Sequence, residues 1–288
     1  WLVKFIRPEN FVNYDLNKEG YTSLLWIFEG FTSYYDDLIL LRSGVINQES
    51  YIKLLKLQID RYLQNPGRAV QTVAESSFDA WVKFYRQDEN SNNAGTSYYN
   101  KGCLVALCLD LGLRLRGSSL DELMRKLYEN AQNGIQVNER TIYELANDLT
   151  GDDWSEQINH LINTTDELPL DQLFPEFGLS YTLNHDKSLP FGLKLADKPE
   201  GVLIQSARRD GSGVLAGLSA NDVIVAIDGL KATAKLVEKY AKQDGTYIVY
   251  AFRRDEFMQF EVKASGSALT EVSLKVEDQA KVEKWLKA

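Results

Sequence analysis

Hydrophobic residues recur with a helical period through the first half of the chain. From Thr22 to about Ile162 they return every three to four positions, which predicts amphipathic helices. The clearest two runs are Leu24, Leu25, Phe28, Phe31, Tyr35 and Ile52, Leu55, Ile59, Tyr62, Leu63. Further helices are predicted at 78–85, at 98–115, from the capping residue Ser119 through Leu127, and around Ile142 and Leu145. We therefore expect a helical domain.

The pattern changes where prolines gather, between Pro169 and Pro199, and the helical period stops there. Short alternating or apolar runs then predict strands at 178–183, 192–195, 201–206, 223–227, 247–252 and 257–262, with helices at 234–242 and 279–287. The predicted fold class is α+β with two domains. Residues 1–175 form the helical domain, and residues 176–288 form a small β-rich domain that includes the C-terminal helix.

Composition excludes several classes of protein. The 288 residues are 44% hydrophobic and 25% charged, which is typical of a folded domain and argues against disorder. The net charge of −9, without a basic run among aromatic residues, argues against a nucleic-acid partner. The longest apolar stretch, 103–109, is too short for a membrane span. Cys103 and Cys108 point to different helix faces and are expected to stay unpaired, which favours a cytoplasmic location.

Glu29 is the first candidate for chemistry. It lies inside a predicted helix with large apolar neighbours on nearly every side, where an unpaired charge is costly. Three explanations are open: a basic partner, a solvent-facing position, or a divalent metal ion that the carboxylate binds.

Several stretches resemble a known family. Residues 29–35, Glu-Gly-Phe-Thr-Ser-Tyr-Tyr, are similar to the segment that carries the third zinc ligand in gluzincin aminopeptidases. Residues 1–8, 77–81 and 97–102, followed by Leu109-Asp110, are similar to successive blocks of the glycyl aminopeptidase family. The chain thus resembles the C-terminal part of such a zinc metallopeptidase, with the helical portion of a thermolysin-like catalytic domain followed by a PDZ domain.

The resemblance implies roles for individual residues. Glu29 would be the third zinc ligand, and Thr32 would be placed to hydrogen-bond a ligand. Tyr99, in the Tyr-x-Lys-Gly motif, would donate a hydrogen bond to the oxyanion of the reaction intermediate, with Tyr98 as a second candidate. The alternative is that both tyrosines are ordinary aromatic residues at a helix start. The implied substrates are peptides with small N-terminal residues such as Gly or Ala.

The remaining zinc ligands of the family are two histidines in a His-Glu-x-x-His helix, whose glutamate is the general base. The two histidines of this chain, His160 and His185, belong to no such motif, so we expect them to be structural or surface residues. The chain alone is therefore expected to bind catalytic zinc poorly and to hydrolyse nothing. Trp1 opens the chain without a methionine or signal peptide, and we interpret it as a cut edge with the missing motif upstream.

The β-rich domain resembles a PDZ domain. Pro190 and the residues after it, Phe191, Gly192 and Leu193, match the loop whose backbone N–H groups bind a peptide C-terminus. The following strand would accept an extended peptide. Two alternatives are open: this segment is a strand without a ligand, or peptide binding is the whole function and the chain is a non-catalytic scaffold. A His-Glu-x-x-His motif encoded upstream would favour the enzyme.

Overall fold

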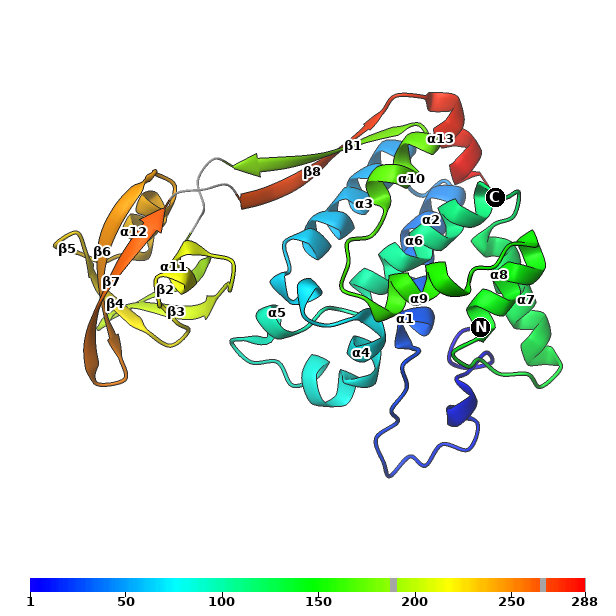
Figure 1. The fold of residues 1–288 in the computed structure, drawn as a ribbon, viewed down its shortest axis with the longest axis horizontal. Coiled ribbons are helices and arrows are strands. Elements are labelled where there is room, and N and C mark those ends of the chain that lie inside the picture. Colours follow the sequence, from blue (N-terminus) through cyan, green and yellow to red (C-terminus); the bar gives the residue numbers. More distant parts are fainter. Residues whose placement is uncertain (187–190, 265–267, 288) are drawn as a thin grey trace.

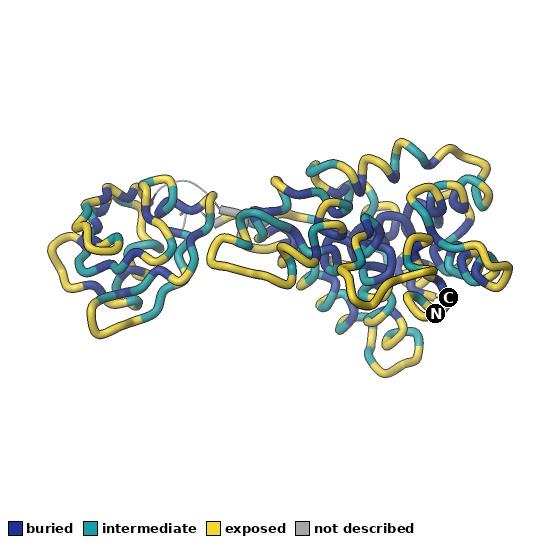
Figure 2. The backbone as a smooth tube through the Cα atoms, turned by 90° about the horizontal axis from the view of Figure 1, so that it is seen from below, coloured by how far each residue is buried: buried dark blue, intermediate teal, exposed yellow. Residues whose placement is uncertain are grey.

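The computed structural model describes residues 1–186, 191–264 and 268–287. Its first unit is a helical bundle (Figure 1). The helices are α1 (Leu25–Phe28), α2 (Gly30–Arg42), α3 (Gln48–Leu63), α4 (Val73–Phe78), α5 (Ser91–Ala94), α6 (Asn100–Arg114), α7 (Leu120–Gln132), α8 (Thr141–Thr150), α9 (Ser155–Asn163) and α10 (Leu170–Glu176). Every residue of α6 except the last is buried, so this helix forms the centre of the bundle, as its apolar sequence indicates. Buried residues gather in the interior of the bundle (Figure 2). Within the described ranges, no helix is long and apolar enough to cross a bilayer.

Local sequence explains some helix starts. The Ser119 hydroxyl accepts a hydrogen bond from the Glu122 N–H and starts α7, as the sequence predicts. The helix expected at 78–85 differs. Helix α4 ends at Phe78, and Ala80–Phe84 forms a wider π-helical turn. Short 3₁₀ segments occur at Glu9–Phe11 and Pro66–Ala69.

A two-stranded ribbon leads from the bundle to a second unit. Strand β1 (Leu179–Asp186) pairs antiparallel with β8 (Ala268–Val276). Between them the chain forms β2 (Leu193–Lys198), β3 (Gly201–Ala207), α11 (Ser212–Leu215), β4 (Val223–Ile227), β5 (Leu230–Lys231), α12 (Ala234–Ala241), β6 (Gly245–Arg253) and β7 (Glu256–Ala264). The sheet order is β2-β3-β4-β6-β7, with β5 paired to β4. This unit has its own apolar core and lies at the far end of the ribbon (Figure 1). We call it the inserted unit.

The C-terminal helix packs with the helical bundle, which differs from the domain division expected from sequence. The side chains of Val282 and Trp285 in α13 (Gln279–Leu286) are buried in the core of the bundle together with Val272 of β8. The Trp285 ring lies 6.2 Å from the ring of Tyr51. The second core is thus formed by residues 191–264 rather than by all of 176–288. The sequence analysis missed β8, the strand that brings the chain back to the bundle.

Helices α2 and α6 touch through two glycines. A Cβ atom at Gly30 would lie 2.6 Å from the Cα of Gly102, and one at Gly102 would lie 2.9 Å from the carbonyl oxygen of Trp26. Such distances leave no room for a methyl group between the backbones. The contact places the first turn of α2 directly against the first turn of α6.

Replacing Gly102 with alanine should therefore force the two helices apart. We expect G102A to lower the free energy of unfolding by about 1–3 kcal/mol, the usual cost of overpacking. Urea denaturation followed by circular dichroism measures this. The control is G134A, where no atom lies within 4 Å of the added methyl and only the left-handed backbone costs about 1 kcal/mol. A loss in G102A below about 1 kcal/mol would contradict the close contact.

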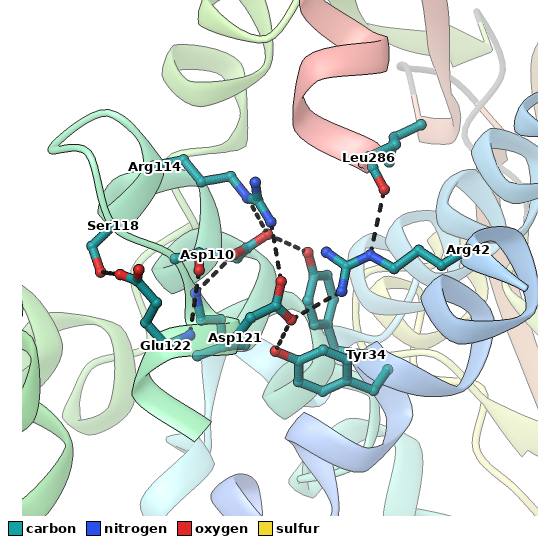
Figure 3. Close-up of polar contacts among 11 residues, drawn as sticks. Tyr34, Arg42, Asp110, Arg114, Ser118, Asp121, Glu122 and Leu286 are labelled. Carbon is teal, nitrogen blue, oxygen red and sulfur yellow. Dashed lines mark hydrogen bonds and ion pairs between the residues drawn. The ribbon is translucent and has the colours of Figure 1, made fainter. Parts of the chain in front are cut away.

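A buried polar network ties four helices of the bundle together (Figure 3). The Asp110 carboxylate accepts hydrogen bonds from the Tyr34 hydroxyl at 2.7 Å and from Arg114 Nε at 3.0 Å. The Asp121 carboxylate accepts one from Arg42 Nη1 at 2.9 Å. Arg42 Nε also donates to the carbonyl oxygen of Leu286, at 3.4 Å. The network joins α2, α6 and α7 to α13, so the C-terminal helix is fixed by polar contacts as well as by its buried tryptophan.

The network makes stability depend on pH. Burial alone would raise the pKa of Asp121, but hydrogen bonds from Arg42 and Tyr35 outweigh it and lower that pKa below its ordinary value. A lowered pKa contributes stability above the ordinary value near 3.9, and this contribution is lost as the pH falls through the folded-state pKa.

Removing the Asp121 charge should remove that dependence. We expect D121N to cost about 1.5–3 kcal/mol at pH 7, and the difference from wild type to shrink below about pH 4. Urea titrations at pH 7 and pH 3.5 measure both values. The control is E129Q, which breaks an exposed pair with Lys126 and should cost less than about 0.5 kcal/mol. A difference that stays constant with pH would contradict the charged role of Asp121.

Candidate functional site

Glu29 lies at the junction of two helices. It follows the last residue of α1 as the C-cap and directly precedes the first residue of α2. Its side chain is half-buried, and its carboxylate makes no hydrogen bond or ion pair with any residue in the described ranges. A basic partner therefore does not explain this carboxylate. The Thr32 hydroxyl donates to the carbonyl oxygen of Phe28 at 2.7 Å, so here it supports the helix junction rather than a ligand.

Tyr99 precedes the first residue of α6, where the Gly30–Gly102 contact holds the two helix starts together. Its side chain is half-buried, whereas Tyr98 is only 1% exposed. The Tyr99 ring lies 4.7 Å from the ring of Tyr98 and 5.7 Å from that of Phe84. Phe84 and Tyr98 thus hold the Tyr99 ring in one orientation.

The surroundings of Tyr99 keep its phenol protonated. Burial raises the pKa of Tyr99, and interaction with the Tyr85 hydroxyl and the negative charge of Glu29 raise it further. The Glu29 carboxylate and the Tyr99 phenol are therefore close enough for the charge of one to act on the other. A phenol with a raised pKa is a hydrogen-bond donor at neutral pH. The structure thus brings together the two residues that the sequence analysis connects.

Tyr98 has a different environment. Its hydroxyl donates to the hydroxyl of Tyr85 at 3.2 Å, and its ring is covered on all sides. Burial is the main cause that raises its pKa, followed by the hydrogen bond with Tyr85. A covered ring leaves little access for a substrate. Tyr98 instead packs against the ring of Tyr99 and hydrogen-bonds the hydroxyl of Tyr85.

Sequence reasoning missed Tyr85. This residue follows the π-helical turn, and 63% of its surface is exposed beside Tyr98 and Tyr99. Single π-helical turns occur often at functional sites, but nothing in a helical hydrophobic pattern distinguishes them.

Lys101 anchors the start of α6. Its side chain is fully buried, and Nζ donates to the carbonyl oxygen of Thr164 at 3.1 Å. That carbonyl follows the last residue of α9, where a cation interacts favourably with the helix end. Burial lowers the pKa of Lys101. The lysine of the Tyr-x-Lys-Gly motif thus fixes the first turn of α6 and, with it, the position of Tyr99.

The two histidines are far from Glu29 and Tyr99 in the sequence, and no contact joins them to either residue in the described ranges. His160, in α9, has Nε2 3.6 Å from the carboxylate of Asp166, and His185 is exposed on β1. The described ranges contain no group of three or more His, Cys, Asp or Glu side chains able to hold a metal ion. Glu29 is therefore available as one ligand, but these residues do not complete a metal site by themselves.

The candidate peptide-binding loop belongs to the inserted unit. Phe191 is buried in its core, and Gly192 has a left-handed backbone with φ of 70°. Pro190 lies outside the described residues. Neither Phe191 nor Gly192 donates its N–H to an acceptor in the described ranges. Leu193 begins β2, a strand at the edge of the sheet. Two free backbone donors beside an open strand edge suit an extended peptide that ends in a carboxylate.

Known proteins share sequence and fold with this chain. Residues 1–105 match the model of the M61 glycyl aminopeptidase family. The whole chain is similar to the crystal structure of an aminopeptidase N family protein from Idiomarina loihiensis, at 36% identity and a TM-score of 0.88. The match covers 100% of this chain and 53% of that protein, so the chain spans about half of its length. No curated protein matches.

Other solved structures match only part of the chain. The HtrA3 PDZ domain bound to a phage-derived ligand shares 13% identity over 34% of this chain and 92% of its own, with a TM-score of 0.24. A serine endoprotease from Yersinia pestis shares 15% identity over 28% of this chain and 29% of its own, also with a TM-score of 0.24. These partial likenesses are too weak to identify the inserted unit. Residues 1–105 are thus similar to the M61 glycyl aminopeptidase family, and the whole chain shares the fold of the Idiomarina aminopeptidase N family protein.

Proposed function

We propose that this chain forms the C-terminal part of a zinc-dependent aminopeptidase that removes small N-terminal residues such as Gly or Ala from peptides. The observation that carries the proposal is the Glu29 carboxylate, which has no partner in the described ranges and lies within electrostatic reach of the protonated Tyr99 phenol. A free carboxylate and a phenolic donor are the groups that a hydrolytic site of this family would need from this part of the protein.

The zinc ion would be shared with residues outside this chain. Glu29 supplies one carboxylate oxygen ligand, and two histidine ligands and the general base would come from polypeptide beyond these 288 residues. When bound, zinc polarises a substrate carbonyl and lowers the pKa of water. The half-buried position of Glu29 favours this role, because a metal cation offsets the cost of burying the carboxylate.

Tyr99 would stabilise the negative charge that develops on the substrate carbonyl oxygen. Its raised pKa keeps the proton on the phenol, and the rings of Phe84 and Tyr98 hold the hydroxyl in place before the substrate arrives. A donor fixed in advance costs no reorganisation during the reaction. Lys101 would act as a positioning residue through its hydrogen bond to the carbonyl oxygen of Thr164.

The first expected outcome concerns the chain alone. The purified 288-residue protein should contain well below one zinc per chain and should not release p-nitroaniline from glycine or alanine p-nitroanilide. Elemental analysis and a chromogenic assay measure the two quantities. Stoichiometric zinc together with turnover would show that the chain completes the site by itself.

The second expected outcome concerns a chimera in which the chain is joined to the part of the Idiomarina protein that the match leaves uncovered. Turnover should appear, and Tyr99→Phe should lower kcat by about 10²–10³-fold without lowering zinc content, because one oxyanion donor is lost. Glu29→Gln should lower zinc content. Tyr143→Phe, a half-buried tyrosine on α8, is the control and should change neither quantity. Full activity of the Tyr99→Phe chimera would remove Tyr99 from the site.

A second candidate function is specific to the inserted unit, for which we propose a PDZ-type site that binds peptide C-termini. It rests on the N–H groups of Phe191 and Gly192, which have no acceptor among the described residues, and on the position of β2 at the edge of the described sheet. If peptide binding were the only activity, the chain would be a scaffold, and the chimera described above would stay inactive.

The peptide site can be tested with a pair of ligands. Acetyl-Ala-Ser-Gly-Ala-Val with a free carboxylate should bind about tenfold or more tightly than its C-terminal amide, because hydrogen bonds to a charged group are worth about 1.5–3 kcal/mol. Isothermal titration calorimetry measures both affinities. Gly192→Ala should abolish the difference, since its Cβ would lie 2.8 Å from the Cα of Gly211. Equal or absent binding of the two ligands would indicate a strand without a ligand.

A further inference from the structure

One loop connects the residues of the candidate site. Residues 86–97, which we call the bridging loop, run from Tyr85 to Tyr98 and Tyr99. The loop is mostly exposed or half-buried, and a cavity of about 240 Å³ lies beneath it, bordered by Phe84 and Gly95. Because little apolar packing holds this loop in place, its position depends on hydrogen bonds.

Some of these hydrogen bonds come from the inserted unit. Asn93 Nδ2 donates to the carbonyl oxygen of Ala207 at 2.7 Å, and Asn93 Oδ1 accepts from the N–H of Arg209 at 2.9 Å. The side-chain amide thus pairs with the backbone on both sides of residue 208. Asn221 Nδ2 adds a third contact, to the carboxylate of Glu89 at 3.1 Å. Figure 1 shows α5, which carries Asn93, on the side of the bundle that faces the inserted unit.

The same turn of the inserted unit also touches the candidate peptide-binding loop. The Arg208 N–H donates to the carbonyl oxygen of Gly192 at 2.8 Å. A Cβ atom at Gly192 would lie 3.2 Å from the Cβ of Arg208 and 2.8 Å from the Cα of Gly211. The turn therefore lies between Gly192 on one side and Asn93 on the other, with direct backbone contact to the peptide loop.

We propose that Asn93 is a positioning residue that couples the two sites: a peptide carboxylate bound at Phe191 and Gly192 and the docked bridging loop stabilise each other. This inference rests on the peptide-binding function proposed above. Binding at Gly192 orders the turn at residues 207–209, and that turn holds the loop that carries Tyr85 at one end and Tyr99 at the other. Because the coupling is an equilibrium property, it must act equally in both directions.

The docking part is tested without a ligand, in the 288-residue chain. We expect Asn93→Ala to speed hydrogen–deuterium exchange in residues 86–97 and 207–209, and Asn93→Asp to have an intermediate effect because it keeps the acceptor and loses the donor. The control is Asn163→Ala at the end of α9, whose side chain bonds only within its helix, to Asn159. Exchange in Asn93→Ala that matches wild type would overturn the docking role.

The coupling is tested with the acetylated pentapeptide, whose blocked N-terminus excludes it as an aminopeptidase substrate. We expect the free-carboxylate form to bind Asn93→Ala about fivefold or more weakly than wild type, and to slow exchange of the bridging loop in wild type but not in Asn93→Ala. Equal affinities, with loop exchange unaffected by peptide, would overturn the coupling while peptide binding stands. If wild type does not distinguish the acid from the amide, the peptide-binding function and the coupling both fail, and the ligand-free exchange alone decides the docking role.

Discussion

The close contact of Gly30 with Gly102 is the constraint on which the candidate site depends. It lets the backbones of α2 and α6 approach more closely than any other pair of residues would allow. Glu29 directly precedes one of these helices and Tyr99 the other. Glu29 and Tyr99, seventy positions apart, therefore come within electrostatic reach of each other, because each directly precedes one of two helices whose first turns touch. The buried Lys101, bonded beyond the end of α9, keeps the second helix start from rotating away.

The helical bundle is completed by the end of the chain. Trp285 and Val282 belong to its core, and Arg42 binds the carbonyl oxygen of Leu286. The inserted unit is consequently connected to the bundle by both strands of the ribbon. Two connections restrict its movement more than one would, and Asn93 adds a polar contact between the two parts. The ribbon and these hydrogen bonds together hold the inserted unit against one face of the bundle.

The candidate site combines a carboxylate, Glu29, with a protonated phenol, Tyr99. The Glu29 carboxylate has no partner in the described ranges, whereas the raised pKa of Tyr99 keeps its phenol protonated. The negative carboxylate favours the protonated phenol, since it raises the pKa of Tyr99. Tyr85 and Tyr98 add hydroxyl groups around Tyr99 without adding charge.

The sequence by itself determined the helical period, the α+β class and the resemblance to a peptidase family, because apolar spacing and contiguous motifs are local properties. It named Glu29 and Tyr99 separately, and only the contact between Gly30 and Gly102 brings their helix starts together. The roles of these two residues remain proposals. Only the tertiary structure decided that α13 belongs to the bundle, since the burial of Trp285 depends on partners far away in sequence. The π-helical turn before Tyr85 and the contact of Asn93 with residues 207–209 also lay beyond sequence reasoning. Every residue carries a backbone carbonyl oxygen, so the sequence does not show which of them accepts a hydrogen bond from Asn93. Only the three-dimensional structure identifies the carbonyl oxygen of Ala207 as that acceptor.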